Sequence, residues 1–215
     1  MSLEYEYQGP KRGADRAVLL AHGAGADMHA KALTVVTDAL ADAQIPSLRF
    51  QYPYRAAGKK APDRPAVLEA STRLAATELA LLAHLPPERL VLGGRSMGGR
   101  YCSLVAGAVD DPLPCLALLL LGYPLHPAGK PEKLRVEHLP RLTMPVAFVS
   151  GTRDSLAGQA GLVDAAATVP GPVTFHWLDS ADHGFRPLKA SGRTIGDVLA
   201  DVAAFSVEWV RALPG

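Results

Sequence analysis

A serine, an aspartate and a histidine occur in this chain in an order suited to nucleophilic catalysis. Ser96 is the centre of Gly94-Arg95-Ser96-Met97-Gly98, and Asp154 and His183 follow it along the sequence. A neutral serine hydroxyl is a poor nucleophile, so a base such as His183 must take its proton during attack. A carboxylate such as Asp154 would hold the imidazole in the right tautomer and stabilise the imidazolium. The three residue types therefore predict acyl transfer through an acyl-serine intermediate.

The segments around Ser96 predict how its hydroxyl is presented. The apolar run Leu90–Leu92 precedes the pentapeptide, and a helix-like segment, Met97–Val109, follows it. A strand, a tight turn and a helix are the context that a Gly-x-Ser-x-Gly nucleophile turn requires. The start of the helix offers unpaired backbone N–H groups to a developing oxyanion. We expect the oxyanion donors to be the backbone N–H groups of Met97 and of Ala24, which lies in a loop of small residues.

Short apolar runs alternate with longer amphipathic or Ala-rich segments along the chain. Continuous apolar strands separated by helices imply a parallel sheet covered on both faces. We predict one α/β domain over residues 1–215, with a doubly wound, mostly parallel sheet of about six to seven strands flanked by helices. The expected strands are Ala17–Ala21, Ser47–Gln51, Leu90–Leu92, Leu116–Leu120, Val146–Ser150 and Val173–Leu178, with an edge strand at Leu3–Gln8. The expected helices are Met28–Ala43, Ala66–His84, Met97–Val109, Gln159–Ala167 and Ile195–Ala212.

The carboxyl ends of parallel strands meet at one edge of a sheet, and sites form beyond that edge. Ser96, Asp154 and His183 each follow a different predicted strand, so we expect them to meet there. Other residues that follow strands at this edge are candidates for substrate binding, namely Gly23, Tyr52, Arg95, Tyr123 and His126.

With these residues in view, the chain resembles the α/β-hydrolase superfamily, and within it small, lid-poor hydrolases similar to dienelactone hydrolase. The resemblance covers roughly residues 16–212. It is carried by His22-Gly23-Ala24-Gly25, Gly94-Arg95-Ser96-Met97-Gly98-Gly99-Arg100, Tyr123-Pro124-Leu125-His126-Pro127, Gly151-Thr152-Arg153-Asp154 and Asp182-His183-Gly184-Phe185. It implies an α/β-hydrolase fold without a lid domain, and hydrolysis without a cofactor. Dienelactone hydrolases carry cysteine where this chain has Ser96, which favours a small carboxylic ester or thioester over a dienelactone.

Several of these residues have alternative interpretations. Asp154 is also suited to cap a helix, and Asp179 and Asp182 are rival acids for His183. Asp182 adjoins His183, so their side chains should diverge, and Asp179 is the better stand-in. We expect His22 to pack beneath the oxyanion loop and Cys102 to be a buried core thiol.

The loops that should ring the site are rich in basic residues. They are Arg55, Lys59, Lys60, Arg64, Arg95, Lys130, Lys133 and Arg153. One hypothesis is that the small-molecule acyl substrate carries a carboxylate or phosphate; the alternative is solvated loop charge. Comparing neutral with anionic esters, in the wild type and in Arg95→Ala, distinguishes the two. Rival functions are a non-catalytic interaction scaffold that keeps the hydrolase fold, and acyltransferase or haloperoxidase-type chemistry with the same triad.

Composition narrows the class of protein further. A formal net charge of +1 gives no reason to expect nucleic acid or a membrane surface as a partner. No secretory signal is visible, and the apolar run Cys115–Leu121 is too short to span a bilayer, so we expect a cytoplasmic protein. Met28 replaces the third glycine of a dinucleotide-binding pattern that would begin at Gly23. No metal-binding pattern is present, and we expect no metal and no cofactor. The sequence leaves the natural substrate and the oligomeric state open.

Overall fold

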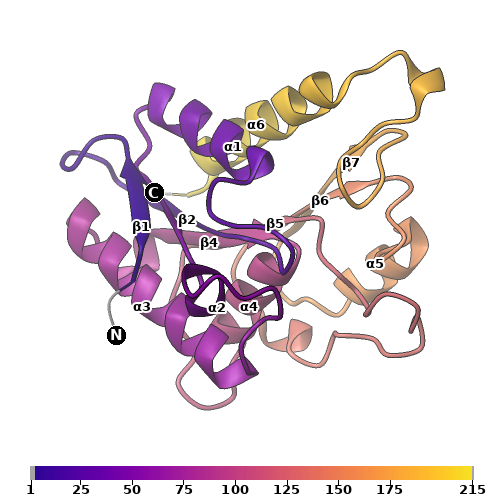
Figure 1. The fold of residues 1–215 in the computed structure, drawn as a ribbon. Helices are drawn as coiled ribbons and strands as arrows, with labels where there is room; N and C mark the ends of the chain where they lie inside the picture. Colours follow the sequence, from indigo (N-terminus) through magenta and orange to yellow (C-terminus); the bar gives the residue numbers. More distant parts are fainter. Residues whose placement is uncertain (1–2, 215) are drawn as a thin grey trace.

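Seven strands form one sheet in the order β1-β3-β2-β4-β5-β6-β7 in the computed structural model, which describes residues 3–214 (Figure 1). The strand β1 pairs antiparallel with β3, and each of the other pairs is parallel. The strands are β1 (Tyr5–Gln8), β2 (Ala17–Ala21), β3 (Ser47–Phe50), β4 (Leu90–Arg95), β5 (Ala117–Leu121), β6 (Val146–Gly151) and β7 (Val173–Leu178). This is the predicted mostly parallel α/β sheet, with β1 as its edge strand.

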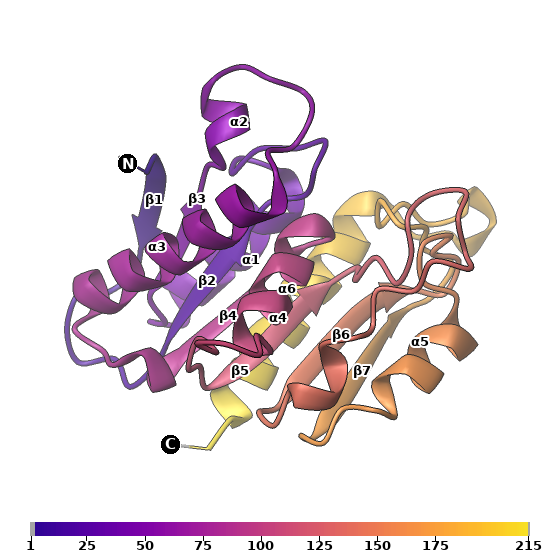
Figure 2. The same ribbon diagram turned by 90° about the horizontal axis from the view of Figure 1, so that it is seen from below.

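Helices cover both faces of the sheet (Figures 1 and 2). On one face lie α1 and α6, and on the other α3, α4 and α5. The helices are α1 (Lys31–Asp42), α2 (Pro53–Ala56), α3 (Pro65–Ala83), α4 (Met97–Ala106), α5 (Gln159–Ala166) and α6 (Ile195–Ala212). Three short 3-10 helices, Pro87–Arg89, Leu139–Arg141 and Lys189–Ser191, lie in connections. The sheet is therefore wound on both sides, as expected.

Alternation along the strands explains why their sequences are apolar without interruption. Successive side chains of a strand point to opposite faces of a sheet. Leu19 and Leu92 pack in the cluster under α3 and α4, whereas Val18, Leu20 and Val91 pack in the cluster under α1 and α6. Both faces are covered, so both sets of side chains are buried and both must be apolar.

Predicted and observed elements differ mainly at their ends. The strand β7 and the helix α6 have the predicted bounds, and α6 begins with a capping box in which Thr194 and Asp197 bond reciprocally. The helix α1 begins three residues later than predicted. The backbone N–H of Met28 donates to the Gln51 side chain at 3.0 Å, and that of His29 donates to Asp27 at 3.0 Å, so this segment is a turn.

The connection from β5 to β6, residues 122–145, contains a single short 3-10 helix, Leu139–Arg141, as its regular structure. An inserted lid domain would have to occupy this or a similar connection at the carboxyl edge of the sheet. The short connection is consistent with the expected fold without a lid domain.

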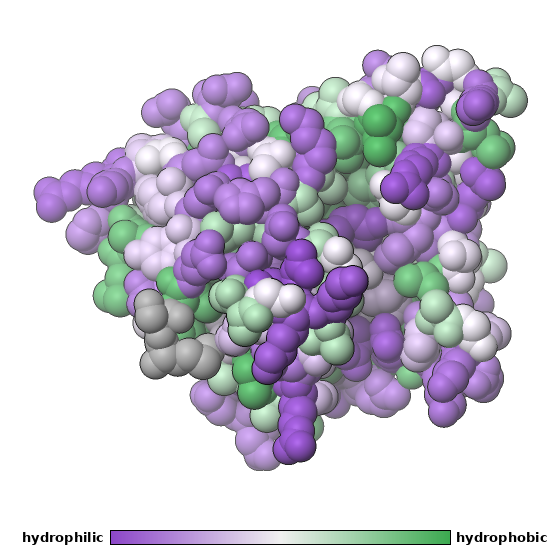
Figure 3. Space-filling model, viewed as in Figure 1, coloured by the Kyte–Doolittle hydropathy of each residue, from purple (hydrophilic) through white to green (hydrophobic). Residues whose placement is uncertain are grey.

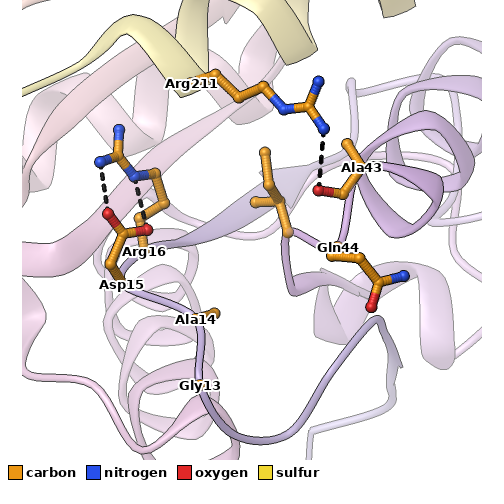
Figure 4. Close-up of a pocket in the computed structure, with 8 residues that line it drawn as sticks. Gly13, Ala14, Asp15, Arg16, Ala43, Gln44 and Arg211 are labelled. Atoms are coloured by element: carbon orange, nitrogen blue, oxygen red, sulfur yellow. Dashed lines mark hydrogen bonds and ion pairs between the residues drawn. The ribbon is translucent and has the colours of Figure 1, made fainter.

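A cavity of about 310 Å³ lies beside the start of β2 and the end of α1 (Figure 4). Its polar side chains bond to neighbouring parts of the fold. Arg16 pairs with Asp15 and donates to the carbonyls of Val210 at 2.7 Å and Leu213 at 2.8 Å. Arg211 donates to the carbonyl of Ala43 at 3.3 Å, just after α1. These arginines tie the end of α6 to the amino-terminal half of the fold.

Candidate active site

Ser96 occupies a sharp turn between β4 and α4. Its backbone angles are φ 50° and ψ −113°, an uncommon conformation for a residue with a side chain. The backbone N–H of Ser96 donates to Leu121 at 2.9 Å, and its carbonyl accepts from the Arg100 N–H at 3.0 Å. The strained residue is therefore held by both the sheet and the first turn of the helix.

Glycines on both sides of Ser96 allow this turn to press against the end of β2. Gly94 has φ +150°, and a Cβ atom there would lie 2.2 Å from the carbonyl oxygen of Ala21. A Cβ atom on Gly98 would lie 2.2 Å from the same oxygen. These approaches explain why glycine stands at both positions of the Gly-x-Ser-x-Gly pattern.

Ser96, His183 and Asp154 form one chain of hydrogen bonds. The His183 Nε2 atom lies 3.0 Å from Ser96 Oγ. On the other side of the ring, His183 Nδ1 lies 2.9 Å and 2.8 Å from the two carboxylate oxygens of Asp154. The Asp154 side chain is fully buried, and its Oδ1 also accepts from the Leu156 N–H at 2.8 Å. The structure thus brings together the three residues predicted from the sequence.

The rival acids face other partners. Asp182 Oδ1 accepts from the backbone N–H of Arg186 at 2.9 Å, which closes the loop that carries His183. Asp179 is exposed and accepts from the Ser180 hydroxyl at 3.1 Å. Phe185, which has φ 63° and is fully buried, anchors the same loop in the core.

Hydrogen bonds from His22 and Tyr54 hold the loop that carries Ala24 in place. His22 is buried, and its Nδ1 atom lies 2.8 Å from the Gly23 carbonyl while Nε2 accepts from the Tyr52 N–H at 3.1 Å. Burial lowers the pKa of His22, which keeps the ring neutral in this bridging role. The Tyr54 hydroxyl donates to the Ala24 carbonyl at 2.8 Å. Met97 is the first residue of α4, so its N–H has no partner within the helix.

Two cavities meet at Ser96 and Ala24. The first, about 360 Å³, is named here the α4-side cavity because Met97, Arg100 and Tyr101 of α4 line it. The second, about 460 Å³, is named the α6-side cavity because Ile195 and Leu199 of α6 line it. His183 lines the α6-side cavity. In the view of Figure 3, mostly hydrophilic residues border a central hollow of the surface.

The five predicted substrate-binding residues lie in different environments. Gly23 and Arg95 line the α6-side cavity, and His126 lines the α4-side cavity. Tyr52 and Tyr123 lie in the core, where their hydroxyls bond to Thr72 at 3.0 Å and to the Arg135 carbonyl at 2.6 Å. The two tyrosines therefore support the site from behind, because their rings and hydroxyls are enclosed by protein.

Arg95 joins two parts of the site through its guanidinium group. It donates to the carbonyls of Leu121 at 3.2 Å and Gly122 at 3.4 Å, and it lies 4.3 Å over the ring of Phe185. Burial lowers the pKa of Arg95 to about 10. Arg95 thereby connects the serine turn with the loop that carries His183.

The sequence-based prediction missed two arginines that line the α4-side cavity with Ser96, namely Arg100 and Arg135. Helical spacing is a signal for Arg100, because it stands four residues after Ser96 and so on the same side of α4. Arg135 lies in the irregular connection after β5, where no periodic sequence pattern predicts the path of the chain or the position of its side chains. Of the basic loop residues predicted to ring the site, Arg55 instead approaches Asp27 at 3.9 Å, and Arg153 donates to Ser180 at 3.3 Å.

Residues 3–214 contain neither a helix suited to cross a membrane nor a cluster of side chains suited to hold a metal ion. None of the helices in this part of the chain is long and apolar enough to cross a membrane. Within the same residues, no three His, Cys, Asp or Glu side chains are grouped so that they could hold a metal ion. Cys102 is buried, as predicted, and its Sγ lies 3.1 Å from the Gly93 carbonyl.

Solved structures share this fold at low sequence identity. One is an alpha-beta serine hydrolase homologue from Coxiella burnetii, with a TM-score of 0.74 and 17% identity over 96% of this chain and 90% of that chain. Another is the dienelactone hydrolase from Anabaena variabilis, with a TM-score of 0.74 and 19% identity over 99% and 93%. A third, from Xanthomonas campestris, is described as an α/β serine hydrolase without lid, with a TM-score of 0.65 and 19% identity over 99% and 91%.

A family model described as "Alpha/beta hydrolase domain" matches residues 14–211. The matched region includes β2 to β7, together with the serine turn and the loops that carry Asp154 and His183. This protein therefore belongs to the alpha/beta hydrolase family.

Proposed function

We propose that this protein is a serine hydrolase that cleaves a small carboxylic ester or thioester through an acyl-Ser96 intermediate. The observation that carries the proposal is the hydrogen-bonded chain from Asp154 through His183 to Ser96. It supplies a nucleophile, a base and a buried carboxylate that orients the base, at the edge of the sheet where two cavities meet.

The first half of the reaction forms the acyl-enzyme. Ser96 Oγ attacks the carbonyl carbon while its proton moves to His183 Nε2, and the backbone N–H groups of Met97 and Ala24 stabilise the oxyanion. The bond to the alcohol or thiol then breaks, and His183 returns the proton to the leaving group. Asp154 stabilises the imidazolium that exists between these two proton transfers.

The second half repeats the chemistry with water. His183 takes a proton from the water molecule as its oxygen bonds to the acyl carbon, and the bond to Ser96 Oγ breaks as that oxygen regains a proton. The products are the free acid and the restored enzyme. Apart from substrate and water, the proposed steps need only Ser96, His183, Asp154 and two backbone N–H groups.

The Ser96→Ala variant tests this proposal directly. We expect it to lose labelling by a fluorophosphonate probe and to lose hydrolysis of 4-nitrophenyl acetate by about 10⁴-fold or more, because the attacking oxygen is absent. Ser191→Ala, on the 3-10 helix Lys189–Ser191, is the matched control and should be labelled like the wild type.

Two outcomes would contradict the proposal. Retained labelling of folded Ser96→Ala would remove Ser96 as the nucleophile. A folded wild type that never reacts with the probe would instead favour the non-catalytic scaffold. Acyl transfer to an acceptor other than water uses the same acyl-enzyme, and the ratio of acid to transfer product measures it.

A further inference from the structure

Arg100 and Arg135 place two positive charges in the α4-side cavity, next to Ser96. Both side chains are half-buried. Neither guanidinium group donates a hydrogen bond to, or forms an ion pair with, any residue of the described range 3–214. The Nε atom of Arg100 is buried without a partner. The Arg100 guanidinium also lies 5.7 Å over the ring of Tyr101. Buried arginine nitrogens are normally satisfied, so the unpartnered Nε of Arg100, in a cavity that Arg135 and Ser96 also line, indicates room for an anion.

The two charges also act on each other. Burial lowers the pKa of Arg135, and the positive charge of Arg100 lowers it further. Asp63 lines the same cavity, but its carboxylate accepts from the Tyr54 N–H at 2.8 Å. An anion bound between the two guanidinium groups would relieve their repulsion and accept hydrogen bonds from their N–H groups.

Much of the remaining lining of this cavity is apolar, although Asp63, Ser96 and His126 also line it. Leu68, Met97, Tyr101, Pro124 and Leu156 contribute to its lining. A ligand suited to the cavity therefore combines a short hydrocarbon segment with an anionic group that the two arginines can bind.

The position of His183 separates the two halves of an ester. The leaving group must receive its proton from His183 Nε2, so it must depart on the side where His183 lies. His183 lines the α6-side cavity. The acyl group then occupies the other cavity, on the α4 side, which Ser96 and Met97 line.

We propose that the α4-side cavity holds a short acyl group that ends in a second carboxylate, bound by Arg100 and Arg135, so that the substrate is a monoester or monothioester of a short dicarboxylic acid. The proposal rests on the proposed hydrolase function. It extends that function by assigning the acid part of the substrate and the two residues that select it.

The test compares two esters that differ only in the charge at the end of the acyl group. They are mono-4-nitrophenyl glutarate and its neutral amide, 4-nitrophenyl 4-carbamoylbutanoate. We expect kcat/KM of the wild type to be about tenfold or more higher for the anionic ester, because hydrogen bonds to charged groups are strong. The double variant Arg100→Gln/Arg135→Gln should lose this preference while it still hydrolyses the neutral ester.

Arg73→Gln is the matched control for removal of an arginine. Arg73 is on α3 and pairs with Asp111 at 3.2 Å, so this variant should keep the preference for the anionic ester. A second pair of esters carries the charge on the other side, namely the butyrate esters of 4-hydroxybenzoate and 4-hydroxybenzamide. A preference for the anion in this pair alone would overturn the assignment of the acyl group to the α4-side cavity.

Calorimetry of glutarate binding to Ser96→Ala measures the contribution of the two arginines to anion affinity without catalysis. We expect binding that the additional Arg100→Gln/Arg135→Gln change removes. A wild type that hydrolyses both glutarate-derived esters equally would overturn this proposal and leave the hydrolase proposal standing. If no ester is hydrolysed but glutarate binds through the arginines, the anion site stands and the hydrolase proposal falls. Absence of both binding and hydrolysis would overturn both.

Discussion

At the scale of single residues, the buried carboxylate of Asp154 has the most specific surroundings. Its oxygens face His183 Nδ1 and accept from the Leu156 N–H, so both are occupied. This arrangement fixes the ring so that Nε2 faces Ser96. The carboxylate side of this pair is fully buried, whereas the ring of His183 is partly exposed at the cavity.

Asp154→Asn should lower kcat for 4-nitrophenyl acetate by about 10³–10⁴-fold, because an amide no longer fixes the tautomer or stabilises the imidazolium. The amide oxygen can still accept from the Leu156 N–H, so the fold should be kept. Steady-state kinetics and circular dichroism measure the two effects separately.

Asp179→Asn is the control, because Asp179 is the exposed rival acid on the same edge. Its kcat should stay within twofold of the wild type. Equal losses in the two variants would remove Asp154 from its assigned role.

At the scale of elements, the close contact between the serine turn and the end of β2 sets the position of the nucleophile. Gly98→Ala should destabilise the protein by about 1–3 kcal/mol, since the added Cβ would lie 2.2 Å from the Ala21 oxygen. Displacement of the end of β2 by the added Cβ should also lower esterase activity, because β2 leads into the loop that contains Ala24. Thermal unfolding and kcat measure the two effects.

Gly158→Ala provides the comparison. No atom lies within 4 Å of a Cβ built at Gly158, which precedes α5. Gly158 is the N-cap residue of α5, where alanine is less favourable than glycine, so we expect a loss of only about 0.5–1 kcal/mol and an unchanged kcat. A similar loss in both variants would mean that the close approach at Gly98 does not decide its cost.

The sequence was most informative where one local pattern determined an element. Continuous apolar runs predicted the strands, and the residues that follow them predicted the meeting of Ser96, Asp154 and His183. The ends of elements were less predictable, as at α1, where the side chains of Gln51 and Asp27 bond to the backbone N–H groups just before the helix. Such contacts depend on residues that are distant in sequence or on local turns.

The binding residues were the least predictable part of the site. Position after a strand selected Tyr52 and Tyr123, but each ring turns into the core, and only the packed structure determines that direction. The same rule could not find Arg100 and Arg135, because one lies on a helix and the other in an irregular connection. Side-chain direction in loops is set by tertiary packing, which a single sequence does not encode locally.

At the scale of the whole molecule, a buried histidine links stability to pH. His138 lies against α4, where its Nε2 atom is 2.8 Å from the Ser103 hydroxyl. Burial, followed by the charges of Arg100 and Arg141, lowers the pKa of His138 from 6.5 to about 4. Between these values the unfolded chain binds a proton that the folded protein does not. The contribution of His138 to the free energy of unfolding is therefore present above the unfolded pKa of about 6.5 and is lost progressively as the pH falls toward 4.

The wild type should lose about 2 kcal/mol of unfolding free energy from this group between pH 7.5 and pH 5. Urea unfolding at the two pH values measures the loss. His138→Gln should show a smaller loss over the same range, although its stability at pH 7.5 is lower than that of the wild type. The remaining slope includes His22, whose lowered pKa acts in the same direction. Equal slopes in the two proteins would contradict this role of His138.

The bonds from Arg16 to Val210 and Leu213 join positions 194 and 197 residues apart. Leu33 and Leu40 of α1 are likewise buried in the same cluster as Val198 and Val202 of α6. During translation, part of this apolar face of the sheet therefore stays uncovered until α6 has been synthesised and has packed beside α1. Asp154 and His183 also belong to the last third of the chain. A fragment that ends before α6 would leave this apolar surface exposed, and one that ends before His183 would also lack the base. The last third of these residues therefore completes both the core and the site.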